Sequence, residues 1–251
     1  MASSLMSFSC LVYFVLLFPT LSTSQNAFVC SRATFYGNPY SLGTASGTCG
    51  FGEFGSTLNG GNVAAVSDLF RHGAGCGACY QVRCTYPGLC NENGVTVVAT
   101  DHGHGDHTDF ILSGRSFSNL ALPNMAEELM AYGVVDIEFK RVSCQYPGHN
   151  LMFKVTEHSN YPYYIALTPI YQGGMKDIVA VQIWQEDCHE WKEMRRAYGG
   201  VWDMANPPRG PLNLRLQVSG EDGQKPIIPL GQVIPGDWQC GAVYDSNLQF
   251  H

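Results

Sequence analysis

GCGACYQVRC, residues 75–84, holds three cysteines, and how they are used decides what kind of fold the chain forms. Cys76 and Cys79 could be a thioredoxin-like redox pair, but such a pair needs a strand before it and a helix start behind it, whereas here glycines surround it. They could also supply half of a zinc site, with Cys84 and Cys90 as a second half at looser spacing. Structural disulfides in a glycine-rich loop region are the better account, provided that the chain is exported to an oxidising compartment.

The N-terminal residues predict that export. An apolar run, CLVYFVLLF at 10–18, is followed by Pro19 and the small residues Ser22-Thr-Ser24. This pattern indicates a secretory signal over residues 1–24, and the run is too short to span a bilayer. No later segment is apolar enough to anchor the chain, so we expect a secreted, extracellular protein without a membrane anchor. Of the ten cysteines, Cys10 leaves with the signal, and the odd number that remains leaves at least one without an intramolecular partner.

Charge and composition narrow the class of ligand. The chain has 14 Lys and Arg against 21 Asp and Glu, and neither half has the basic excess that a phosphate backbone requires. Nucleic acid is therefore excluded as a partner. Charged residues make up only 14% of the chain, whereas Gly, Tyr and Phe are plentiful. This balance favours β structure that meets a neutral, hydroxyl-rich ligand.

The cysteine distribution indicates two domains. Six cysteines lie between Cys49 and Cys144, and a short linker, Pro147-Gly-His-Asn150, follows them. We expect the first domain to span 25–148 and the second 149–251. Alternating or β-branched runs predict strands at 95–100, 134–139, 151–155, 164–171, 178–184, 200–202 and 212–218. Helical spacing predicts short helices over 62–71 and 123–132. Several short strands in the second half indicate a sandwich.

TDHGHGDHTDF, residues 100–110, is the densest cluster of ionisable groups. Its histidines are of the type that binds metals, but interleaved glycines leave their geometry unconstrained, so no metal site is predicted. Asp101 and Asp109 could be the two carboxylates that glycoside hydrolysis needs.

Aromatic residues could form either core or a platform for sugar rings. They occur at 35–36, 161, 163–164, 184, 191, 198 and 202. Neighbours on a strand point to opposite faces, so one of Tyr163 and Tyr164 should face outward.

Several motifs together resemble the plant expansins, most closely their expansin-like B branch. The first half carries ATFYG (33–37), GTCGFG (47–52), the 75–84 stretch and ATD (99–101), and the second carries DIVAV (177–181), YGGVW (198–202) and VIPGDW (233–238). Closest to the expansin-like B branch are GGNVA (60–64), WQEDC (184–188) and VWDMANPP (201–208).

The resemblance implies an all-β, two-domain fold. A six-stranded double-psi β-barrel like that of family-45 endoglucanases and barwin (core 46–148) would be followed by an immunoglobulin-like carbohydrate-binding sandwich (core 161–246). It also implies disulfides between Cys49 and Cys76, between Cys79 and Cys144, and between Cys84 and Cys90. Cys30, Cys188 and Cys240 receive no partner from the pattern.

The sequence departs from the hydrolytic relatives at the positions that would cut a glycan. The catalytic base of the endoglucanases corresponds to Asn38, which cannot take a proton. Aligned on Leu112-Ser113, a second essential Asp becomes Ile111, and the His that precedes it becomes Asp109. On a strand, Asp109 would stand about 7 Å from the Ile111 position, too far for a general acid that must come within about 3 Å of its oxygen. Gly103 replaces a tyrosine of some relatives.

The remaining groove positions point to binding. Thr34, Tyr36 and Asp101 match groove residues of the family and, with Asp109, can hydrogen-bond a glucan. The surface aromatics of the second domain map onto Tyr164 and Tyr198, whereas Trp191 and Trp202 are expected to be buried or partly buried.

We therefore expect a monomeric cell-wall protein that binds cellulose and xyloglucan-type chains and loosens their contacts without hydrolysis, a cofactor or a metal. A weak glycoside hydrolase that uses Asp101 and Asp109, and a barwin-like signalling or defence module, remain as alternatives.

Overall fold

Six strands of the first half close into a barrel, in the order β1-β5-β2-β4-β3-β6. The computed structural model describes residues 27–105, 108–219 and 223–249; the predicted signal, 1–24, lies outside them. The barrel strands are β1 (Val29–Tyr36), β2 (Val63–Val66), β3 (Cys79–Cys84), β4 (Val95–His102), β5 (Phe110–Ser113) and β6 (Val135–Val142). Alternate side chains of these strands fill the barrel with Val, Ala and Phe. The expected double-psi type of barrel is confirmed.

Short helices lie in the connections between the barrel strands. They are α1 (Phe54–Thr57), η1 (Leu58–Gly61), η2 (Asp68–Gly73), α2 (Gly114–Ser118) and α3 (Ala126–Met130). The helix expected over 123–132 corresponds to α3. The helix expected over 62–71 is wrong, because its first half is β2, which is buried on both faces. A strand covered on both sides is apolar throughout, so its sequence cannot be told from a short buried helix.

The second half is a sandwich of two antiparallel sheets. One has the order β10-β9-β13-β14 and the other β11-β12-β8-β7-β15. Their strands are β7 (Met152–Val155), β8 (Tyr164–Ile170), β9 (Ile178–Gln185), β10 (Glu190–Glu193), β11 (Arg195–Tyr198), β12 (Val201–Ala205), β13 (Leu212–Val218), β14 (Ile227–Ile234) and β15 (Val243–Asp245). Strand β13 spans the predicted residues, and its leucines enter the core while Asn213, Arg215 and Gln217 face outward.

Three disulfides fasten the barrel half. They join Cys49 to Cys76, Cys79 to Cys144 and Cys84 to Cys90, the pairs that the family resemblance implies. Cys76 and Cys79 are thus not bonded to each other. Among the described residues, Cys30, Cys188 and Cys240 are free and exposed.

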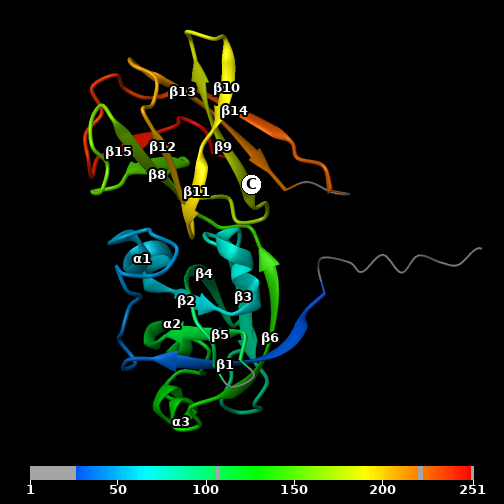
Figure 1. Ribbon diagram of the computed structural model, residues 1–251. Coiled ribbons are helices and arrows are strands. Elements are labelled where there is room, and N and C mark those ends of the chain that lie inside the picture. Colours follow the sequence, from blue (N-terminus) through cyan, green and yellow to red (C-terminus); the bar gives the residue numbers. More distant parts are fainter. Residues whose placement is uncertain (1–26, 106–107, 220–222, 250–251) are drawn as a thin grey trace, which may run out of the picture.

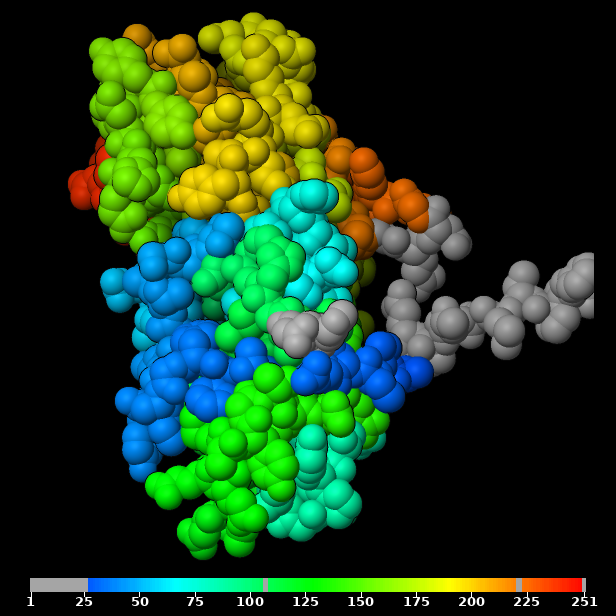
Figure 2. Space-filling model, turned by 60° about the horizontal axis from the view of Figure 1, so that its bottom comes forward, coloured from blue at the N-terminus to red at the C-terminus, as the bar shows by residue number. Residues whose placement is uncertain are grey.

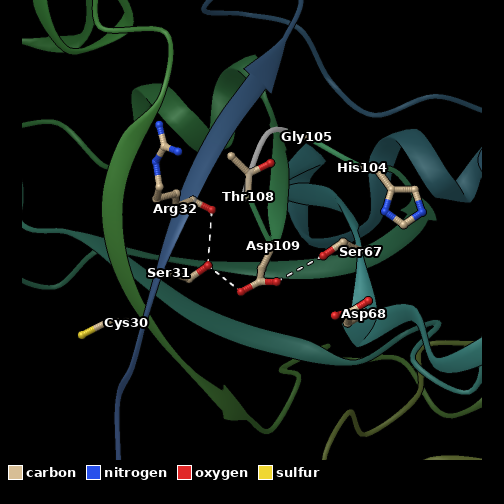
Figure 3. Close-up of a pocket in the computed structure, with 9 residues that line it drawn as sticks. All are labelled: Cys30, Ser31, Arg32, Ser67, Asp68, His104, Gly105, Thr108 and Asp109. Carbon is tan, nitrogen blue, oxygen red and sulfur yellow. Dashed lines mark hydrogen bonds between the residues drawn. The ribbon is translucent and has the colours of Figure 1, made fainter.

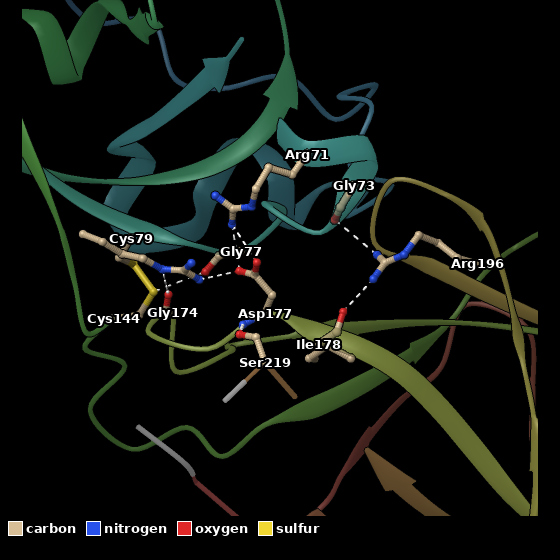
Figure 4. Close-up of polar contacts among 11 residues, drawn as sticks. Arg71, Gly73, Gly77, Cys79, Cys144, Gly174, Asp177, Ile178, Arg196 and Ser219 are labelled. Carbon is tan, nitrogen blue, oxygen red and sulfur yellow. Dashed lines mark hydrogen bonds and ion pairs between the residues drawn. A yellow bond between two sulfur atoms is a disulfide. The ribbon is translucent and has the colours of Figure 1, made fainter. Parts of the chain in front are cut away.

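The two halves are stacked end to end (Figure 1), and the expected boundary at 148 falls between β6 and β7. A hydrophobic cluster crosses the joint, in which Phe51 and Tyr146 of the barrel half meet Ile170 of the sandwich. Beside it, Asp177 of the sandwich accepts ion pairs from Arg71 at 2.8 Å and Arg141 at 2.6 Å (Figure 4). Within the described parts of the chain, no helix is both long and apolar enough to cross a bilayer.

Candidate functional site

Strand register fixes which residues surround Asp101. Thr34 on β1 pairs with Ile111 on β5, Ile111 pairs with Ala65 on β2, and Ala65 pairs with Asp101 on β4. Residues paired in this way share one face of a sheet, so the four form a row across the outside of the barrel. Two strands away from Asp101, where the family alignment places a second carboxylate in hydrolytic relatives, the row holds the aliphatic side chain of Ile111.

The carboxylate of Asp101 is held by the turn that contains Thr48. The Thr48 backbone N–H and hydroxyl donate to Oδ1 of Asp101 at 2.6 Å and 2.7 Å, and the His102 N–H donates to the same oxygen at 2.8 Å. No hydrogen bond among the described residues engages Oδ2. Asp101 therefore presents one fixed oxygen that can accept a hydroxyl from a ligand.

Tyr36 lies near this carboxylate. Partial burial, together with the charge of Asp101, raises the pKa of the Tyr36 phenol to about 12, so the phenol stays protonated and can donate a hydrogen bond at any physiological pH. The Thr34 hydroxyl, in contrast, already donates to the Gly133 carbonyl at 2.8 Å. The structure thus brings Tyr36 and Asp101 together, while the Thr34 hydroxyl donor is already used.

Asp109 lies in a separate hollow of about 840 Å³ (Figure 3), among whose lining residues are Ser31, Ser67 and His104, but not Asp101. Its two carboxylate oxygens accept hydrogen bonds from the hydroxyls of Ser31, at 2.6 Å, and Ser67, at 3.1 Å. The register between β1 and β5 runs without a bulge, and the Asp109 N–H donates to the Arg32 carbonyl, which leaves Asp109 two residues before Ile111 along β5 and outside the row of Asp101. The hypothesis of an acid–base pair of Asp101 and Asp109 is therefore not supported by their positions.

The neighbouring histidines pack on aromatic partners. The His102 ring stacks on Phe70 at 4.5 Å between ring centroids, and His104 meets His102 edge-on at 4.6 Å.

Tyr198, one of the two predicted surface aromatics of the sandwich, lies directly beside the turn that contains Thr48. Its ring lies against Gly50, whose positive φ of 77° and close neighbours leave no room for a side chain: a Cβ there would stand 3.0 Å from the Tyr198 ring and 2.3 Å from Val201. The turn that holds Asp101 is therefore also the surface on which Tyr198 rests. Tyr198 remains 49% exposed, as a stacking platform requires.

Tyr164 lies on the same five-stranded sheet and is half-buried. Its hydroxyl donates to Asp203 at 2.9 Å, and Arg195 donates to both oxygens of Asp203 at 2.9 Å and 2.6 Å. Burial, followed by the bond to Asp203, raises the pKa of Tyr164, so it too remains protonated. Its ring is oriented by these contacts, whereas the adjacent Tyr163 is 65% exposed.

Two family models match the chain. Residues 151–235 match the family described as Expansin C-terminal domain, and residues 62–139 match the one described as Lytic transglycolase. Expansin-like B1 of Arabidopsis thaliana is 50% identical over 94% of each chain, and Expansin-like B1 of Oryza sativa subsp. japonica is 44% identical over 94% of this chain and 93% of its own. The chain belongs to the expansin family, in its expansin-like B branch.

Two further expansins are less similar to this chain. Expansin-B1 of Zea mays is 36% identical over 93% of this chain and 88% of its own. A crystal structure of Clavibacter michiganensis expansin without ligand covers 90% of this chain at a TM-score of 0.65, and a mutant of that protein in complex with cellohexaose gives 0.66; each alignment spans 98% of the bacterial chain at 21% identity. At that identity the likeness shows a shared two-domain fold.

In this expansin, sequence reasoning missed the residues that support the site. Thr48 and Gly50 lie in the GTCGFG motif, and the glycines were the available signal for a tight turn beside Asp101. Arg195 could not be recognised from the sequence. Its contact with Asp203 depends on the pairing of β11 with β12, which no local motif indicates. Trp202 is buried, as expected, and half-buried Trp191 packs at a tilt of 59° against Trp184 on the other sheet.

Proposed function

We propose that this expansin-like chain is a secreted plant cell-wall protein that binds cellulose and matrix glucans along a groove from Tyr164 and Tyr198 to Asp101 and Tyr36, and loosens their contacts without hydrolysis. The observation that carries the proposal is the continuity at the joint. One turn, residues 48–50, holds Asp101 on one side and supports Tyr198 on the other. A single extended chain can therefore meet both sets of groups.

The chemistry of these groups suits a neutral glucan. Aromatic rings offer flat apolar surfaces to sugar rings, while Oδ2 of Asp101 and the protonated Tyr36 phenol offer an acceptor and a donor for hydroxyls. These contacts replace hydrogen bonds and stacking between neighbouring polysaccharide chains, and no covalent step is involved. The cellohexaose complex of the bacterial expansin supports this ligand class.

Non-hydrolytic action is supported by the row through Asp101. General acid–base cleavage requires a second carboxyl group across the bond, at roughly 5–9.5 Å depending on the mechanism. Ile111 fills the row in this chain, and the Asp109 carboxylate is bonded to two serines elsewhere. A barwin-like module acting alone fits the structure less well, because the barrel is joined to the sandwich by a shared hydrophobic cluster.

Binding is tested by cellulose pull-down with the double variant Tyr164→Ala and Tyr198→Ala. Loss of both rings should remove binding in the groove, so retention on cellulose should fall sharply. Tyr132→Ala is the matched control, since Tyr132 is 53% exposed and lies outside the groove. Unchanged retention of the double variant would refute the groove assignment.

Hydrolysis is tested separately, by measuring reducing ends released from a β-glucan over long incubation. We expect none. Release by the wild-type chain that disappears in Asp101→Asn would make the protein an enzyme and contradict the non-hydrolytic mechanism without affecting the binding proposal.

A further inference from the structure

Two adjoining hollows, of about 800 and 690 Å³, lie over α2 and α3. They share Ser118, Asn119, Asn124 and Ala126, so they form one continuous depression. In Figure 2 the blue N-terminal segment borders the green segment of α2 and α3 on this side of the barrel. None of the residues that line either hollow is Tyr36, Asp101, Tyr164 or Tyr198.

Six asparagines line this depression, and a ladder of hydrogen bonds orients several of them. The Asn119 amide donates to Oδ1 of Asn62 at 2.9 Å, the Asn62 amide donates to the Asn59 carbonyl at 3.0 Å, and the Asn59 amide donates to the Thr96 carbonyl at 2.7 Å. The ladder leaves Oδ1 of Asn119 and the whole Asn124 amide without a hydrogen bond to any described residue. Oriented amides with unused hydrogen-bond donors and acceptors can pair with the hydroxyls of a ligand.

An open aromatic ring stands at the rim. Tyr40 lines the first hollow and is 84% exposed, the most exposed of the large hydrophobic side chains in the described residues. Its loop is nevertheless fastened: the Tyr40 N–H donates to Oδ1 of Asn38 at 3.0 Å, and the Arg115 N–H donates to the Ser41 carbonyl at 3.0 Å. A ring that is exposed on a fixed loop offers a flat apolar face at little cost in chain entropy.

The lining of the depression carries no net charge. No charged side chain lines the second hollow, and the first has one of each sign, Arg115 and Glu127. The Arg115 guanidinium already donates to the Gly60 carbonyl at 3.1 Å. Such a lining attracts neither anions nor cations, and its donors and acceptors match a ligand that is rich in hydroxyls and carries no charge.

We propose that Tyr40 and the surrounding asparagines, here called the Tyr40 tract, form a second binding site for a neutral oligosaccharide. The ring of Tyr40 stacks on a sugar ring, and the amides of Asn119 and Asn124 pair with its hydroxyls. Because none of the four groove residues lines the tract, one protein molecule can hold two glycan chains at once.

The tract is tested in the chain whose groove is disabled by Tyr164→Ala and Tyr198→Ala. Calorimetric titration with cellohexaose, a xyloglucan heptasaccharide and xylohexaose should show one remaining equivalent for at least one of them. Adding Tyr40→Ala and Asn124→Ala should weaken that binding at least about tenfold, which is about 1.4 kcal/mol. Tyr40→Phe should retain it, because the ring and not the hydroxyl makes the contact.

Tyr132→Ala serves as the control in the same background and should bind like its parent, with thermal unfolding showing that each variant is folded. The proposal is overturned if the groove-disabled chain binds none of these sugars, if the Tyr40 and Asn124 changes leave binding intact, or if only an anionic oligogalacturonide binds. Failure of the groove proposal gives a different result, since it would leave the titration of Tyr164→Ala with Tyr198→Ala identical to that of the wild type.

Discussion

The barrel and the sandwich are stabilised by different means. All three disulfides of the described residues lie in the barrel half, whose strands are joined by long loops and single-turn helices. The sandwich has no disulfide among its described cysteines and depends on two sheets with alternating apolar residues, such as the four buried positions of β13. Covalent links thus compensate where the connections between strands are long, and side-chain packing suffices where they are shorter.

The largest effect is expected from removing the disulfide that closes the longest loop. Cys79 and Cys144 are 65 residues apart, and replacing both with Ala should cost about 4 kcal/mol of unfolding free energy. The tryptophans at 184, 191, 202 and 238 all lie in the sandwich, so their fluorescence in a denaturant titration follows that half. Far-UV circular dichroism should then show the barrel unfolding at lower denaturant than the tryptophan signal.

The other two disulfides close shorter loops and test whether the loss of stability depends on loop length. Removing Cys49–Cys76, 27 residues apart, should cost less, and Cys84–Cys90, 6 residues apart, the least, about 2 kcal/mol. Cys188→Ser, at an exposed free cysteine, should change nothing. Equal losses for all three pairs would show that strain or packing at the cysteines, and not loop closure, determines their contribution.

The joint between the halves should depend on Asp177. In Asp177→Asn, Arg71 and Arg141 lose their charged partner, and we expect a cost of about 2 kcal/mol, less than for a fully buried pair because the arginines are partly exposed. Differential scanning calorimetry should show the unfolding peak broadening or separating into two, as the halves become less coupled. Glu190→Gln, which removes an exposed ion pair with Lys192, is the matched control and should cost less than about 0.5 kcal/mol. A single unchanged peak in Asp177→Asn would assign the coupling to the hydrophobic cluster instead.

The smallest effect concerns pH and the sandwich face. The Arg195 guanidinium holds the pKa of Asp203 below its ordinary value, although burial opposes this. A lowered folded-state pKa stabilises the fold above the pKa of the unfolded chain, about 3.9, and this stabilisation is lost as the pH falls through the folded-state value. The melting temperature of Asp203→Asn should therefore lie below that of the wild type by a constant margin from pH 7 to about pH 5 and approach it below about pH 3. A margin that shrinks already between pH 7 and pH 5 would contradict this origin.

Strands could be predicted from the sequence where apolar and polar residues alternate, because one face is buried and the other is exposed. Strand β13 alternates because one face is buried and the other exposed, and its bounds were predicted correctly. Strand β2 was mistaken for a helix because barrel strands and loops cover both of its faces, which removes the alternation. The pairing of the cysteines came from the family resemblance, since spacing alone cannot choose among the possible partners.

Sequence patterns were enough to predict the composition of the candidate site: Asp101 and Tyr36 in the barrel, aromatics in the second half, and an aliphatic Ile111 where a second carboxylate would be needed. Which of these residues lie together depends on the folded structure. Strand register placed Ile111 in the row of Asp101 and Asp109 in another hollow, and the packing of the two halves brought Tyr198 against Gly50. The physical reason is that hydrogen-bond register and the docking of two surfaces are properties of residues far apart in the chain, which no local pattern records.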